Sequence, residues 1–113
     1  MNYKKISVDV YGQNVWITRD IETAKRLAWR HCGRRITDDD FCGKGLTAYG
    51  FGNSVVWLHE RSWVNTLAHE MTHVALNIFN YTNANVDTNN QEPAAYLIGY
   101  LTGEAFHWLD AQK

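Results

Sequence analysis

Residues 69–73 read His-Glu-Met-Thr-His, and this motif constrains the chain more than any other feature. On an α-helix, residues four apart lie on one face, about one turn from each other. His69 and His73 can therefore both bind a single metal ion when this segment is helical. Two imidazoles at that spacing are typical ligands of Zn²⁺. The sequence predicts a helix that carries a metal site, with Zn²⁺ as its cofactor.

Two glutamates complete the pattern. Glu70 lies roughly 100° around the helix from the first histidine, beside the metal but not bound to it. There it can act as the catalytic general base that takes a proton from a water activated by the metal. Glu92 follows the motif after 18 intervening residues, at the start of a second predicted helix, and is the expected third metal ligand. Asp87, Glu104 and His107 remain alternative third ligands.

The HExxH helix is expected to run from a cap at Ser62 to about Asn80. Its side opposite the histidines is apolar, which favours packing of that side on a sheet. The residues on this apolar side are Leu67, Met71, Val74, Ala75 and Ile78.

The last predicted helix runs from about Gln91 to Leu109, and Glu92 shares one face of it with a stripe of small residues. Small side chains let two helices approach closely, so we expect this face to pack against the metal side of the HExxH helix. Tyr96 lies on the same face and is a weak candidate for a catalytic hydrogen bond, with Tyr100 weaker still. The small residues of the stripe are Ala95, Gly99 and Gly103.

The first half of the chain reads as two hairpins and one helix. Apolar residues alternate with polar ones within 6–10 and 15–17, and a second pair of strands is expected at 46–49 and 54–58. A helix from Ile21 to Cys32 separates the hairpins. We therefore expect one α+β domain over residues 1–113. Its antiparallel sheet of about four strands would carry an N-terminal helix, the HExxH helix and a C-terminal helix with the third ligand.

With HExxH, 18 residues and then a glutamate, the chain resembles the gluzincins, a group of zinc metallopeptidases. The spacing is that of the M1 aminopeptidases, and the short length resembles minimal gluzincins and small HExxH proteins of phages and mobile elements. The resemblance covers roughly residues 54–109. It implies a zincin-like fold in which His69, His73 and Glu92 bind zinc and Glu70 is the general base.

The resemblance also implies how a substrate would bind, and where this chain departs from the family. Residues 54–58 match the edge strand on which zincins lay an extended peptide. The M1 motif that grips a substrate amino terminus is absent, which favours an endopeptidase over an aminopeptidase. The helical subdomain that usually forms the far wall of the cleft is also missing. A partner chain could complete the cleft, or the protein could be a zinc-stabilised, non-catalytic binding, inhibitor or phage accessory protein.

Composition limits the partners that we expect. A formal net charge of −1 argues against nucleic acid and against an anionic membrane surface, and no apolar run is long enough to span a membrane. A protein or peptide substrate is the expected partner. The first residues show no signal-peptide pattern, so a cytoplasmic location is expected, in the host cytoplasm if the protein is phage-encoded. Cys32 and Cys42 are expected to be reduced thiols there.

Overall fold

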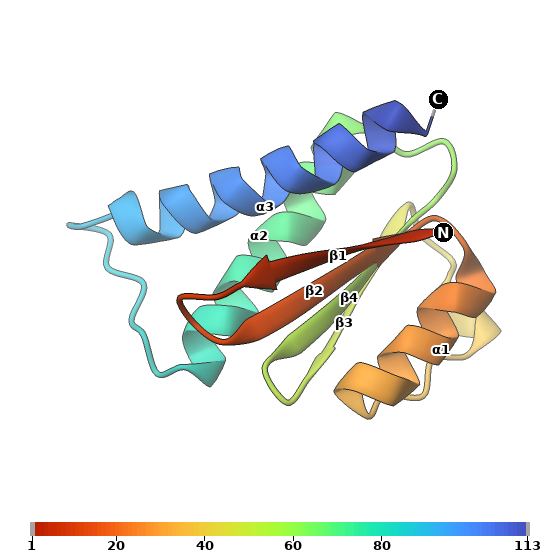
Figure 1. The fold of residues 1–113 in the computed structure, drawn as a ribbon, viewed down its shortest axis with the longest axis horizontal. Coiled ribbons are helices and arrows are strands. Elements are labelled where there is room, and N and C mark those ends of the chain that lie inside the picture. Colours follow the sequence, from red (N-terminus) through yellow and green to blue (C-terminus); the bar gives the residue numbers. More distant parts are fainter. Residues whose placement is uncertain (1, 113) are drawn as a thin grey trace.

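A four-stranded sheet with helices on both faces organises the chain (Figure 1). The computed structural model describes residues 2–112, and residues 1 and 113 of the predicted domain lie outside the described part. The α+β class, the two hairpins and the three predicted helices are confirmed. The elements are β1 (Tyr3–Val8), β2 (Gln13–Thr18), α1 (Ile21–Cys32), the 3₁₀ turn η1 (Asp38–Asp40), β3 (Gly45–Gly50), β4 (Asn53–Leu58), α2 (Val64–Tyr81) and α3 (Glu92–Ala111).

The sheet is mixed, so the predicted all-antiparallel sheet is wrong. Its strand order is β1-β2-β4-β3, and the two hairpins β1–β2 and β3–β4 are antiparallel as expected. Between the hairpins, however, β2 and β4 run parallel, from the pair Val15↔Ser54 to the pair Thr18↔Trp57. Helix α1 carries the chain over one face before the second hairpin joins the sheet. Turn residues fix each hairpin locally, but they do not determine how the two hairpins join.

The strand at 54–58 is a central strand, and the prediction that it forms the sheet edge is wrong. β4 lies between β2 and β3, which leaves β3 at the edge. All four residues from Val55 to Leu58 are buried. A continuous apolar run of this kind is typical of a strand that is covered on both faces. Only a central position with helices above and below provides that cover.

Two apolar cores lie on opposite faces of the sheet. Alternate residues of β4 point into each: Val56 and Leu58 into the larger core beneath α2 and α3, and Val55 and Trp57 into the smaller core beneath α1. The five apolar residues predicted for the buried side of α2 all lie in the larger core, which confirms the prediction of which side of this helix is buried. Neither α2 nor α3, nor any other described helix, is both long and apolar enough to cross a membrane.

Helix α3 turns a different face inward from the one predicted. A methyl group at Gly99 or Gly103 would meet nothing within 4 Å, and Ala95 is exposed, so the small-residue stripe does not pack on α2. The opposite face, with one large or apolar residue every four positions, is buried instead. It removes more apolar area from water than the glycine stripe could, and this decides the orientation. The buried residues are Leu97, Leu101, Ala105 and Leu109.

The orientation of α3 can be tested by substitution. Gly99→Ala and Gly103→Ala should each raise the free energy of unfolding by about 0.5–1 kcal/mol, because alanine favours a helix and its methyl group enters open space. Leu101→Ala should lower it by about 2–5 kcal/mol, because it leaves a cavity in the core. Urea unfolding measures all three. Loss of stability in both glycine variants would show that the stripe is packed against another element.

Candidate metal and catalytic site

Arg19 holds the segment that leads into α2. Its guanidinium donates hydrogen bonds to the carbonyl oxygen of His59 at 2.6 Å and to that of Ser62 at 3.3 Å. The same group lies 5.7 Å from the centre of the Trp63 ring. Partial burial lowers the pKa of Arg19 below its ordinary value. The predicted cap, Ser62, does not cap the helix, because its hydroxyl donates instead to the carbonyl oxygen of Lys44 at 2.5 Å.

The two motif histidines contact each other through their ring nitrogens. Helix α2 presents both side chains to solvent, and the Nε2 atoms of His69 and His73 lie 3.2 Å apart. Two nitrogen ligands about 2.05 Å from a tetrahedral Zn²⁺ lie roughly 3.3 Å from each other. The observed contact, which is also the length of a hydrogen bond between the two rings, is therefore close to the separation of two zinc ligands. The apolar side of α2 rests on the sheet, which is what turns the histidines outward.

Glu70 lies beside this pair but turns toward the sheet. Only 6% of the residue is exposed. Its Oε1 atom accepts a hydrogen bond of 2.7 Å from the Thr47 hydroxyl on β3. Its Oε2 atom lies close to Gly45, since a Cβ atom added to that glycine would be 3.0 Å from Oε2. Any larger residue at position 45 would therefore crowd the carboxylate. The edge strand thus orients the carboxylate through the Thr47 hydroxyl, which binds Oε1, and leaves space at Oε2.

An open hollow lies in front of Glu70 and the first motif histidine. Its volume is about 310 Å³. Polar groups dominate its wall, and one cation, Lys44, stands at its rim. A small polar molecule or a segment of extended peptide can enter here and reach the Glu70 carboxylate. The residues that line the hollow are Lys44, Gly45, Asn65, Thr66, His69 and Glu70.

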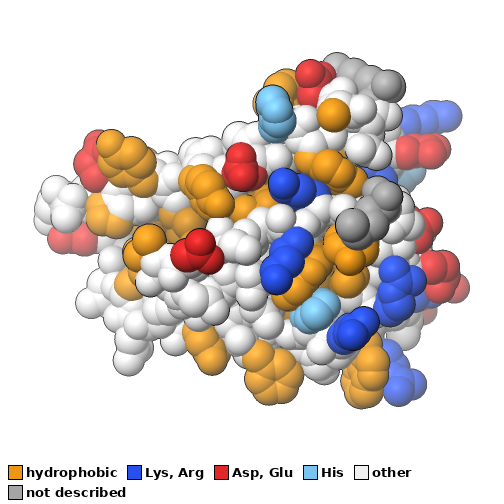
Figure 2. Space-filling view, viewed as in Figure 1, with side chains coloured by type: hydrophobic (Ala, Val, Ile, Leu, Met, Phe, Trp, Pro, Cys, Tyr) orange, Lys and Arg blue, Asp and Glu red, His pale blue; other side chains and the backbone are white. Residues whose placement is uncertain are grey.

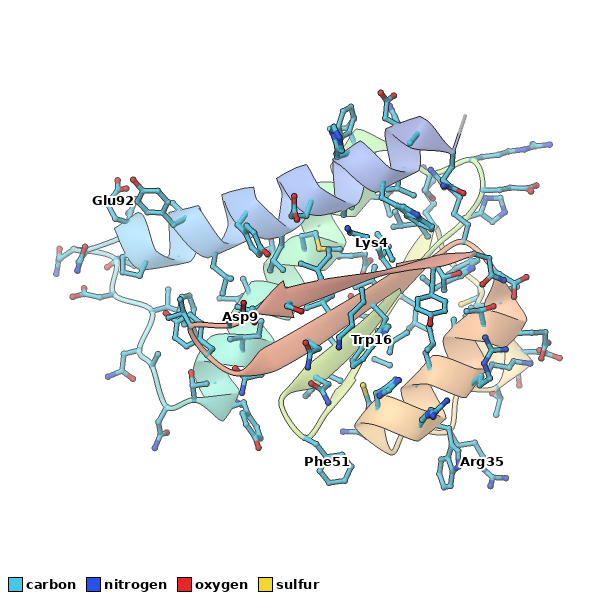
Figure 3. All side chains as sticks on the ribbon, viewed as in Figure 1. Lys4, Asp9, Trp16, Arg35, Phe51 and Glu92 are labelled. Carbon is cyan, nitrogen blue, oxygen red and sulfur yellow. The ribbon has the colours of Figure 1, made fainter. Side chains whose placement is uncertain are left out.

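The structure does not bring Glu92 to the histidine pair. Glu92 is the first residue of α3, and its exposed side chain points outward from the end of that helix (Figure 3). It lines a separate hollow, together with Tyr96 and the open glycine face. Tyr96 is 73% exposed and does not line the hollow at Glu70. Within residues 2–112, no three His, Cys, Asp or Glu side chains are grouped so that they could hold a metal ion.

The alternative third ligands are also exposed. Glu104 and His107 lie on the outward side of α3, and Asp87 lies in the segment before it, where its side chain accepts a hydrogen bond from the Asn89 backbone. The structure therefore brings His69 into contact with His73 and places Glu70 with His69 at one hollow, and it groups none of the candidate third ligands with the histidine pair.

Sequence reasoning missed the part that β3 plays in the site. Thr47 and Gly45 are two residues apart, so they lie on the same face of the strand, and that face meets α2. The alternation of side chains along a strand could have placed Gly45 and Thr47 on one face. It could not have shown that this face meets the HExxH helix, because that depends on β3 being the edge strand beside α2.

Comparison with protein-family models, with curated proteins and with solved structures found no match. The chemistry of the site therefore has to follow from its own residues.

The contact between Thr47 and Glu70 can be measured directly. Thr47→Val should lower the free energy of unfolding by about 1–3 kcal/mol, because a buried carboxylate loses its hydroxyl donor while the shape of the side chain is kept. Urea unfolding gives the value. In a Glu70→Met background, the same substitution should have a much smaller effect, because no carboxylate remains to be satisfied. An equal loss in both backgrounds would show that Thr47 acts through some other contact.

Proposed function

We propose that the chain is a zinc-dependent metallopeptidase that hydrolyses peptide bonds in a protein or peptide substrate. The separation of 3.2 Å between the Nε2 atoms of His69 and His73 carries this proposal, because it fits two ligands of one Zn²⁺. Glu70 follows His69 in the chain, lines the same hollow and would supply the general base. The gluzincin-like sequence pattern supports the same reading.

The roles of the residues follow from their positions. Bound zinc would polarise the substrate carbonyl and make a water more acidic. Glu70 accepts the proton of that water as it attacks the carbonyl carbon, and then passes the proton to the nitrogen of the leaving amine. Thr47 holds Oε1, so Oε2 is the oxygen that is available for the proton. The absent side chain of Gly45 keeps the space at Oε2 open.

Glu92 is proposed as the third ligand, and its coordination requires a movement. The residue stands at the junction between segment 82–91 and α3, and segment 82–91 is made mainly of exposed residues. Rotation of the whole of α3 would expose its buried leucines, at about 1.5–3 kcal/mol for each side chain. Displacement of the segment and the first turn of α3 involves only exposed or half-buried residues. We therefore propose that zinc binding draws this end of α3 toward α2.

An extended substrate would pair with β3. This strand forms the edge of the sheet and carries Gly45 and Thr47 beside the Glu70 carboxylate, whereas β4 already has a neighbour on each side. Addition of a peptide strand to a free sheet edge supplies backbone hydrogen bonds along its length. A protein substrate or a partner chain could form the other wall of the open groove.

Zinc titration tests the metal site. Protein stripped of metal should bind one Zn²⁺ per chain, and His73→Ala should abolish this binding. Glu92→Gln should weaken it by at least about tenfold, because one charged ligand is lost. Competition with a chromophoric chelator gives the affinities, and elemental analysis gives the stoichiometry.

Glu104→Gln is the matched control for that titration, because it removes an exposed glutamate from the same helix. It should bind zinc like the wild type. If Glu104→Gln weakened binding and Glu92→Gln did not, Glu104 would be the ligand. Tight binding of zinc by His73→Ala would remove the basis of the proposed function.

A second candidate function is a zinc-stabilised binding protein without turnover. It is favoured by the burial of Glu70, whose hydrogen bond to Thr47 would also suit a purely structural residue. Digestion of a broad peptide library separates the two functions. A peptidase should lose at least about 100-fold in kcat with Glu70→Gln while it keeps its zinc, because an amide cannot accept the proton. Equal cleavage by wild type and variant would exclude the proposed mechanism, and zinc binding without any cleavage would favour the second candidate.

A further inference from the structure

Arginines and exposed aromatic rings gather around the C-terminal end of α1 and the tip of the β3–β4 hairpin. Trp29 is 59% exposed, Tyr49 is 47% exposed and Phe51 is 75% exposed. Figure 2 shows blue Lys and Arg side chains among orange ones over this part of the molecule, and Figure 3 labels Arg35 and Phe51 at its lower border. We call this surface the arginine–aromatic face. It consists of Trp29, Arg30, Arg34, Arg35, Tyr49 and Phe51.

Two of its arginines lie over the rings. The guanidinium carbon of Arg35 lies 5.4 Å from the centre of the Trp29 ring, and that of Arg34 lies 5.5 Å from the centre of the Tyr49 ring. Arg34 also donates a hydrogen bond of 3.0 Å from Nε to the carbonyl oxygen of Tyr49. A stacked guanidinium keeps its outward N–H groups free for a carboxylate. These side chains therefore lose little conformational freedom when a partner binds.

The hairpin tip holds Phe51 in a strained position. Its φ is +56°, a left-handed conformation that is unfavourable for a bulky side chain. The ring covers Gly33, where an added Cβ would lie only 2.8 Å from ring atom Cε2. Gly33 itself has a φ of +64° and ends α1. The tip of the β3–β4 hairpin and the end of α1 thus fix an aromatic ring that remains largely in solvent.

The arginines of the face form no salt bridge among the described residues. Both salt bridges among the described residues use Lys25, which pairs with Glu22 and Asp38 and not with the arginines of the face. His31 stacks on Trp16 beside the face, and nearby positive charge is one of the influences on its pKa. Its pKa is lowered by burial first and then by the positive charges of Arg30 and Lys5.

We propose that the arginine–aromatic face docks an acidic segment of another protein. Trp, Tyr and Arg are the residues that most often dominate binding energy in protein interfaces, whereas Lys is depleted there, and all the cations of this face are arginines. The exposed rings would cover apolar side chains of the segment, and the guanidinium groups would pair with its carboxylates. A chain with a net charge of −1 has little long-range attraction for nucleic acid, which favours a protein partner. None of the residues of the face lines the hollow at His69 and Glu70, so docking there leaves that hollow open.

A labelled peptide tests the proposal. The probe is a fluorescein-tagged 20-residue peptide of five Glu-Asp-Leu-Gly repeats, and fluorescence anisotropy is recorded with a metal chelator present, so that the result does not depend on the proposed zinc site. The wild type should bind the peptide. Arg34→Gln with Arg35→Gln should weaken binding by at least about tenfold, and Trp29→Ala with Phe51→Ala by at least about fivefold. The matched control, Lys4→Gln with Arg61→Gln, removes two cations outside both the face and the hollow at Glu70, and should bind within about twofold of the wild type.

Two further arms make the outcome decisive. Arg34→Lys with Arg35→Lys keeps the charge and loses the planar guanidinium groups that can pair with a carboxylate through two hydrogen bonds, so its binding should also weaken, by at least about threefold. Circular dichroism melting shows whether each variant is folded, and the lysine variant serves if the glutamine variant is not. Failure of the wild type to bind, an equal loss in the control, or full binding by the lysine variant would overturn the proposal. Tighter binding of a 20-nucleotide oligothymidylate than of the peptide would also overturn it and assign the face to nucleic acid.

Discussion

The pairing of β4 on both of its edges and its burial on both faces organise the molecule. Val55 to Leu58 can be removed from water only if one helix covers each face, so α1 must lie on one side and α2 on the other. This arrangement pushes β3 to the sheet edge, beside α2. The site follows from the same constraint, because Thr47 on the edge strand reaches Glu70 only in this strand order.

Three consecutive residues of α2 lie in three different environments. Met71 is buried in the core, Glu70 is buried against the edge strand, and His69 faces solvent. The helix therefore presents its polar motif at the border between core and water. A carboxylate at such a border is oriented by few contacts and remains close to water, and both properties suit a base that must exchange protons.

Local patterns predicted the elements well, and long-range packing explains what they missed. The helix predicted from Ile21 to Cys32 has those bounds in the structure, where Asp20 accepts a hydrogen bond from the Thr23 backbone and Gly33 ends α1. Helix α3 has two faces that could pack, one with Glu92 and glycines and the other with Leu97 and Leu101. A helical wheel shows both faces but not which one the sheet covers. The strand order and the contact between Thr47 and Glu70 depend on residues more than 20 positions apart, which local periodicity does not report.

The parallel pairing of β2 with β4 has a consequence for how the chain folds. It joins residues that are 39 positions apart, such as Val15 and Ser54, whereas the turn of the first hairpin joins Val8 to Gln13. Hairpins and helices form in microseconds, but pairing over a long separation must first overcome the entropy of closing the loop. Until α1 docks, β2 and β4 each present an unpaired edge, and such edges recruit other chains. We therefore expect the crossover to slow the folding of this domain and to lengthen the period in which these edges can pair with other chains.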